Sequence, residues 1–150
     1  MNKLQQTFKI NPLYEADSYK VAHKAMLAPG TTRLYGTWIP RSLKYMPGGI
    51  NKIMSAGQQL VVRYLHSTFE ENFFFKRNIE NELEGGMYTR SEKIEIYPGV
   101  KARYKKQAMQ FVVDISAHLG VDFDGKHFED LYDLGYLPIK IKALPEGLMK

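Results

Sequence analysis

The sequence contains no cysteine among its 150 residues. A disulfide framework, a thiolate metal site and a cysteine nucleophile are therefore excluded, and the composition fits a reducing compartment without establishing one. No apolar run approaches the roughly 18 residues of a membrane-spanning helix, and the opening MNKLQQTFKI has no apolar signal region. From these absences we expect a cytoplasmic location and no membrane partner.

Several motifs of nucleotide binding and catalysis are also missing. No glycine is followed by Lys-Ser or Lys-Thr, and the GxGxxG, HExxH and GxSxG patterns do not occur. The two glycines of MPGGIN are more simply explained as a turn than as a phosphate-binding loop. The four histidines, His23, His66, His118 and His127, are too scattered for a metal-binding motif. The residues alone therefore predict no catalytic centre and no metal site.

What is present is the composition of a globular protein with a basic excess. Hydrophobic residues make up 44% and charged residues 25%, and the formal net charge is +5. This charge favours anionic partners such as phosphorylated metabolites. The densest basic stretch, KARYKK at 101–106, is typical of a solvated helix face. A nucleic-acid partner would rest on the charge and the aromatic residues alone, and we do not expect one.

The spacing of apolar residues predicts about four helices. Asp17 or Ser18 caps the first, which runs to about Leu27 before Pro29-Gly30 stops it. The other helices are expected from about Ser55, across Tyr104 to Leu119 with Gly120 as its end, and over His127 to Leu134 with Gly135 as its end. Between residues 77 and 98 the periodicity fades, and Gly85-Gly86 indicates a loop or excursion.

Two segments have the composition of β-strands. Residues 31–39 are rich in Thr, Tyr, Trp and Ile. In LPIKIKAL, residues 137–144, apolar side chains alternate with Lys140 and Lys142, the pattern of a half-buried strand whose lysines are structural or interfacial. We therefore predict a single α+β domain over residues 1–150, with about four helices and at least two strands.

Four stretches together carry a family resemblance. ADSYKVAH, TTRLYGTWIPR, AGQQLVVRYL and DLGYLPIKIKALPEG occur here in the order and approximate spacing of the N-terminal part of nicotinamide phosphoribosyltransferases. The resemblance covers roughly residues 11–65 and 131–147, and its W-I-P-R and D-L-G-Y-L-P wording is similar to the bacterial and bacteriophage branch. In the family an α/β barrel follows the PEG turn, and we expect this chain to lack that C-terminal barrel.

The resemblance implies an enzyme of NAD salvage. Such an enzyme joins nicotinamide to the ribosyl carbon of phosphoribosyl pyrophosphate, with Mg²⁺ neutralising the pyrophosphate in the complete enzyme. The family's sites lie at a dimer interface, where each N-terminal segment lends residues to the neighbouring subunit. The implied partners are therefore the two substrates, and either a second copy or a barrel-containing chain. No metal ligand is implied in this chain alone.

The resemblance also assigns substrate-binding residues. Tyr19 matches the tyrosine that stacks on the nicotinamide ring, and Arg41 matches an arginine that contacts substrate phosphate, a task suited to a guanidinium fork. Asp17 is a further candidate, although its position equally fits a helix N-cap. Lys20 could approach phosphate or lie in solvent. Without the resemblance, Tyr19 would be interpreted as a core residue and Arg41 as a surface residue.

Two functional interpretations stay open. As the N-terminal part of the enzyme, the chain would hold half of a composite site and show no activity alone. As a non-catalytic dimerisation or interaction protein derived from this domain, it would instead pair with full-length enzyme. Both interpretations keep Tyr19 and Arg41, so the sequence does not separate them.

Overall fold

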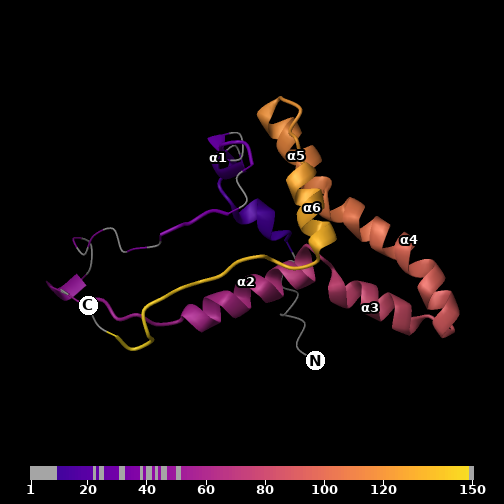
Figure 1. Cartoon of the computed structure of the whole chain (residues 1–150), viewed down its shortest axis with the longest axis horizontal. Helices are drawn as coiled ribbons and strands as arrows, with labels where there is room; N and C mark the ends of the chain where they lie inside the picture. Colours follow the sequence, from indigo (N-terminus) through magenta and orange to yellow (C-terminus); the bar gives the residue numbers. More distant parts are fainter. Residues whose placement is uncertain are drawn as a thin grey trace.

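The protein is described by a computed structural model covering residues 10–21, 23, 26–30, 33–37, 39, 42, 44, 47–49 and 52–148. Figure 1 shows helices joined at a central point, from which α3 and α4 project as a hairpin. In chain order the helices are η1 (Pro12–Glu15), α1 (Ser18–Val21), η3 (Pro47–Gly49), α2 (Gln58–Asn72), α3 (Lys76–Gly85), α4 (Arg90–Ala108), α5 (Gln110–Leu119) and α6 (Lys126–Leu134).

The predicted α+β class is wrong, because the described residues form helices and no sheet. Residues 137–144 run beside α2 as an irregular segment, exposed from Pro138 onward, and the described part of 31–39 is also irregular and exposed (Figure 1). Alternation and β-branched composition show only that a segment would fit a pleated surface. A strand also needs a neighbouring strand to share its backbone hydrogen bonds, and neither segment has one among the described residues.

Residues 77–98, expected to form a loop or excursion, are largely helical. They contain most of α3 and the first half of α4, and Pro98 lies inside α4. Thr89 and Glu92 start α4 with a capping box, in which the Thr89 amide lies 2.7 Å from the Glu92 carboxylate. The apolar period is weak here because the hairpin buries little, with Ile79 its buried residue in α3.

The predicted helix from Tyr104 to Leu119 is divided at Met109 into the end of α4 and α5. Its predicted end is confirmed, since Gly120 adopts a left-handed φ of 67° that favours glycine. Two basic residues of KARYKK join α4 to its neighbours. Arg103 pairs with Glu82 on α3, and the Lys105 Nζ lies 2.8 Å from the Asp133 carboxylate on α6.

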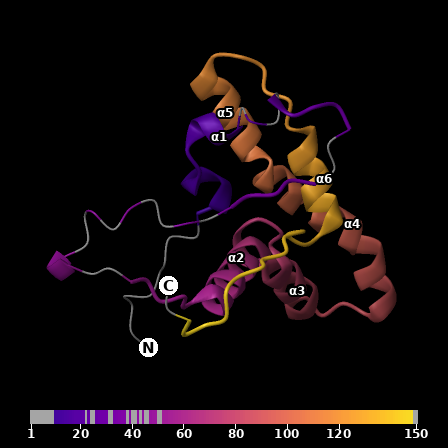
Figure 2. The same cartoon turned by 60° about the vertical axis from the view of Figure 1, so that its left-hand side comes forward.

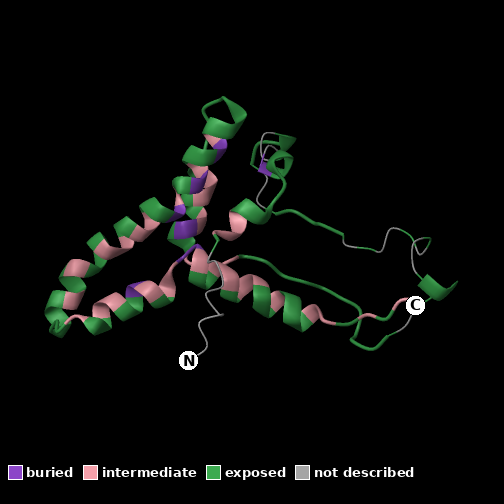
Figure 3. Cartoon of the chain, turned by 180° about the vertical axis from the view of Figure 1, so that it is seen from behind, coloured by how far each residue is buried: buried purple, intermediate pink, exposed green. Residues whose placement is uncertain are grey.

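The buried core lies where the helix ends meet (Figure 3). One cluster packs the end of α2 against α4 and α6, and a second packs α1 against α5; Leu13 of η1 contacts both. The first contains Phe73, Phe74, Ala108 and Tyr132, and the second contains Val21, Phe111 and Ile115. The core therefore fixes the segment that carries Tyr19 against α5.

Candidate functional site

The candidate site begins with η1, which anchors the segment before Tyr19. Asn11 caps η1 by accepting a hydrogen bond from the Leu13 amide, and Pro12 occupies the first helical position. The Asn11 side-chain amide also donates to the Ala108 carbonyl at the end of α4, over 3.2 Å. This carbonyl lies at the break between α4 and α5, so one asparagine closes two helix ends.

A second anchor lies three residues further on. The Tyr14 hydroxyl donates to the carboxylate of Asp114 on α5, and the Gln110 side chain donates to the same carboxylate over 2.9 Å. Partial burial and the bond to Asp114 raise the pKa of Tyr14 to about 12, whereas the bonds from Tyr14 and Gln110 lower the pKa of Asp114. The Tyr14 ring also meets Phe111 edge-on, at 5.2 Å between centroids.

Helix α1 lies beside α5 (Figure 2). Tyr19 belongs to α1, between the Tyr14 anchor and the buried Val21. Its side chain is 58% exposed, so it is not a core residue. The Lys20 Nζ lies 4.8 Å from the centroid of the Tyr19 ring, and the His23 ring meets it edge-on at 5.7 Å. The fold thus holds both ends of this short segment and presents an aromatic ring, flanked by a cation, to solvent.

The other predicted site residues have mixed outcomes. Arg41 lies outside the described residues, so its role stays a prediction. Asp17 directly precedes α1, in the position expected of an N-cap, and its backbone carbonyl accepts a hydrogen bond from the Lys20 amide at 2.8 Å. The described helix is shorter than predicted, since it ends at Val21 and residues 22, 24 and 25 are not described.

A separate contact joins two of the stretches that carry the family resemblance. The Ser55 amide donates to the Leu148 carbonyl at 2.9 Å, and the Gly147 amide donates to the Ser55 carbonyl at 2.7 Å. Helix α2 starts after Gly57, which has no side chain to cap the helix. The Gln59 amide instead donates to a carboxylate oxygen of Glu146 at 3.4 Å. The PEG turn therefore closes over the start of α2.

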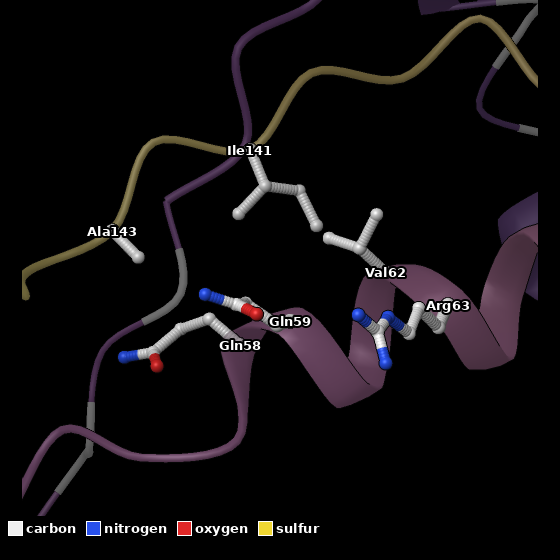
Figure 4. Close-up of a pocket in the computed structure, with 6 residues that line it drawn as sticks. All are labelled: Gln58, Gln59, Val62, Arg63, Ile141 and Ala143. Carbon is white, nitrogen blue, oxygen red and sulfur yellow. The ribbon is translucent and has the colours of Figure 1, made fainter. Parts of the chain in front are cut away.

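Beside this contact lies an open hollow of about 330 Å³ between α2 and the C-terminal segment (Figure 4). Figure 4 shows Ile141 and Val62 approaching each other across it, with Arg63 at one side. Gln58 anchors the segment by donating to the Leu144 carbonyl at 3.4 Å, while its own carbonyl oxygen is buried without a partner. The lining residues are Gln58, Gln59, Val62, Arg63, Ile141 and Ala143.

The structure therefore shows two separate sites of contact between the resemblance stretches and the helices, rather than one assembled binding site. The C-terminal stretch LPIKIKALPEG packs against α2, which contains most of AGQQLVVRYL. The stretch ADSYKVAH packs on α5 through Val21. Lys140 and Lys142 are exposed on the C-terminal segment. Within the described ranges, no three His, Asp or Glu side chains gather as a metal site. No described helix is long and apolar enough to cross a membrane.

Sequence reasoning missed the residues that hold the segment before Tyr19 and the start of α2 in place. The Asn11-Pro12 pair is a local signal for a helix start that could have been recognised. Gln110 joins Asp114 within α5, four positions away. Asp114 and Glu146, by contrast, act across long sequence separations, and the Tyr14–Asp114 bond spans 100 positions. No local period or motif encodes such a pair.

Comparison with known proteins shows which class of enzyme the chain resembles. The chain is similar to a glycosyl-transferring enzyme over 145 residues, at 31% identity, and the similarity covers 94% of this chain. That relative is the nicotinamide phosphoribosyltransferase of Acinetobacter baylyi. The resemblance carried by the four stretches is thus confirmed, and it is consistent with the N-terminal part of the enzyme.

The match covers only part of the relative, because the chain spans 24% of the length of this curated protein. No protein-family model matches the sequence. No solved structure matches it either.

Proposed function

We propose that the chain supplies the N-terminal substrate-binding part of a nicotinamide phosphoribosyltransferase of NAD salvage. The observation that carries this proposal is the 31% identity extending over 94% of the chain. Similarity of that extent includes the site segment and the α2 contact, rather than one short motif. Since the match spans 24% of the relative, the activity requires a polypeptide that corresponds to the other three quarters.

In this proposal Tyr19 provides a stacking face for the nicotinamide ring. The ring is exposed, and the anchors at Tyr14 and Val21 fix the chain on either side of it. Aromatic stacking contributes about 0.5–1.5 kcal/mol beyond the burial of area. Lys20, above the ring, adds a positive charge that suits an anionic second substrate. Asp17 is proposed mainly as the cap of α1.

Arg41 is proposed to contact the phosphate of phosphoribosyl pyrophosphate. Mg²⁺ would arrive with this substrate to neutralise the pyrophosphate, and we assign it no ligand from the described residues. The active unit is proposed to be a dimer in the cytoplasm, with Tyr19 and Arg41 serving the neighbouring subunit's site.

A chimera tests the proposal, with these 150 residues replacing the matched region of the Acinetobacter baylyi relative. The chimera is incubated with nicotinamide, phosphoribosyl pyrophosphate and Mg²⁺, and nicotinamide mononucleotide is measured. We expect product from the chimera. A folded chimera without product, beside an active parent enzyme, would contradict the proposal and favour the non-catalytic interpretation.

A further inference from the structure

The stretch of chain that carries Tyr19 lies at the surface of the protein. Residues 14–20 are all exposed, whereas Val21 after them is buried against α5. A stretch with little buried apolar surface is ordered mainly by the specific bonds that it makes. Within the described part of the chain, the hydrogen bond that joins this stretch to α5 runs from the Tyr14 hydroxyl to the carboxylate of Asp114. This bond therefore links the exposed stretch to the body of the protein.

Helix α5 holds the Asp114 carboxylate ready to accept that bond. The Gln110 side chain, one turn earlier in α5, donates to the other carboxylate oxygen at 2.9 Å. The Tyr14 ring meets the buried Phe111 edge-on, at 5.2 Å between centroids. A hydrogen bond to an ionised acceptor is strong and an edge-on ring pair is directional, so the two contacts fix the Tyr14 side chain. Helix α5 therefore sets the direction in which the chain leaves η1 towards Tyr19.

We propose that Asp114 is a positioning residue for nicotinamide, acting through Tyr14 on the stretch that carries Tyr19. The inference rests on the proposed function and adds a residue that lies outside the regions of family resemblance. Asp114 itself touches no substrate. A stacking ring binds well when it is already held in the orientation of the complex, because binding then has less to order. Without the bond, nicotinamide has to order the stretch as it binds, and its affinity falls.

Asp133 offers a matched control for Asp114. Both carboxylates are exposed, and Asp133 also accepts a bond from another element, from the Lys105 Nζ at 2.8 Å. These side-chain bonds lower the pKa of both carboxyl groups. Asp133, however, joins α6 to α4 rather than α5 to η1. Loss of either carboxylate removes a comparable surface contact, and only the loss of Asp114 should affect nicotinamide.

Steady-state kinetics of the chimera, with each substrate varied in turn, tests the proposal. Asp114→Ala should raise the KM for nicotinamide by about twofold to fivefold, which does not exceed the loss expected on removing the Tyr19 ring. The kcat and the KM for phosphoribosyl pyrophosphate should stay nearly unchanged. Asp133→Ala should change none of the three. Asp114→Asn keeps a carbonyl oxygen as acceptor for the hydroxyl and should restore part of the affinity.

A further set of variants asks whether Asp114 acts through Tyr19. In a chimera that already carries Tyr19→Ala, Asp114→Ala should cause no additional change in the KM for nicotinamide, because no ring is left to position. Tyr14→Phe removes the same bond from its other end, so it should match Asp114→Ala and serves in its place if that variant does not fold. A general structural defect would instead add to the effect of Tyr19→Ala.

Hydrogen exchange in the free 150-residue chain tests the positioning without any activity. Asp114→Ala should speed the exchange of amides in residues 11–21 by about threefold or more, since this range opens more often without its link to α5. The amides of Tyr14 and Lys20, which donate hydrogen bonds within this range, report on it directly. Asp133→Ala should leave the exchange of residues 11–21 unchanged.

Four outcomes would overturn the proposal: an unchanged KM for nicotinamide in an active Asp114→Ala chimera, an equal rise in both KM values, an equal effect of Asp133→Ala, or unchanged exchange of residues 11–21. A chimera that makes no product in any form contradicts the proposed function instead. The exchange measurement then decides separately whether Asp114 holds the stretch in place.

Discussion

The Tyr14 hydroxyl donates a hydrogen bond to the carboxylate of Asp114, a residue 100 positions further along the chain. This bond fastens η1 to α5, five residues before Tyr19. Gln110 donates to the same carboxylate, so the acceptor is itself held in place. The segment that carries the exposed Tyr19 is therefore held in part by Gln110 and Asp114, which lie outside the regions of family resemblance.

The Tyr14–Asp114 bond should make stability depend on pH at both ends of the scale. The pKa of Asp114 is lowered in the folded chain, so its contribution is present above the unfolded value and lost as pH falls through the folded one. The pKa of Tyr14 is raised to about 12, so its contribution is present below about pH 10 and lost as pH rises towards 12.

Urea denaturation at a series of pH values checks both the acid and the alkaline limb of the curve of stability against pH. Asp114→Asn should flatten the acid limb relative to the unsubstituted chain, and Tyr14→Phe should flatten the alkaline limb. Tyr132, whose pKa burial also raises to about 12, stays in both variants and accounts for any residual alkaline loss. Limbs that coincide in all three proteins would show that the bond contributes nothing to stability.

Phe73 should be the most sensitive position in the core. Its side chain is 0% exposed, and its ring contacts Phe69, Phe74 and Tyr132. Truncation of a buried phenylalanine costs about 3–5 kcal/mol, which is a large part of the stability of a small domain. Phe73→Ala should therefore unfold the chain at ambient temperature, as followed by circular dichroism.

Tyr35→Ala is the matched control for that substitution, because the Tyr35 side chain is 98% exposed. It should leave the melting curve unchanged. Equal stability of the two variants would refute the assignment of the first core cluster.

Much of the helical structure could be predicted from the sequence, whereas the described residues form neither of the two strands that it predicted. Helices α5 and α6 end at Gly120 and Gly135 as expected, since a left-handed glycine is a local signal. The alternation of Ile139 and Ile141 with lysines is also local, but a sheet is a property of two segments, and the described chain supplies no second strand.

The candidate site divides in the same way. Tyr19 could be identified as a substrate-binding candidate only through the family resemblance, because a single exposed aromatic side chain leaves no periodic pattern in the sequence. The anchors at Asn11 and Asp114 depend on contacts between distant residues, which neither composition nor motif encodes.

Tyr19→Ala in the chimera should raise the KM for nicotinamide and leave the KM for phosphoribosyl pyrophosphate nearly unchanged. Loss of about 0.5–1.5 kcal/mol of stacking corresponds to a weakening of roughly twofold to tenfold. Tyr19→Phe keeps the ring and should retain most of the affinity. Steady-state kinetics with each substrate varied in turn checks this. Equal changes in both KM values would indicate a general structural defect instead.

Arg41→Ala should affect the neighbouring subunit's site rather than its own. A heterodimer is prepared from one chimera carrying Arg41→Ala and another inactivated outside residues 1–150. If sites are shared, one site holds both defects and the other holds neither, so about half of the intact dimer's activity remains. If Arg41 serves its own subunit, each site holds one defect, and activity should be nearly lost.

Formation of nicotinamide mononucleotide by two separate polypeptides tests the central claim most directly. This 150-residue chain and the relative's polypeptide lacking its matched region are co-purified and supplied with nicotinamide, phosphoribosyl pyrophosphate and Mg²⁺. We expect product from the pair and none above background from either part alone. Product from the 150-residue chain alone, or none from a stable pair, would contradict the account.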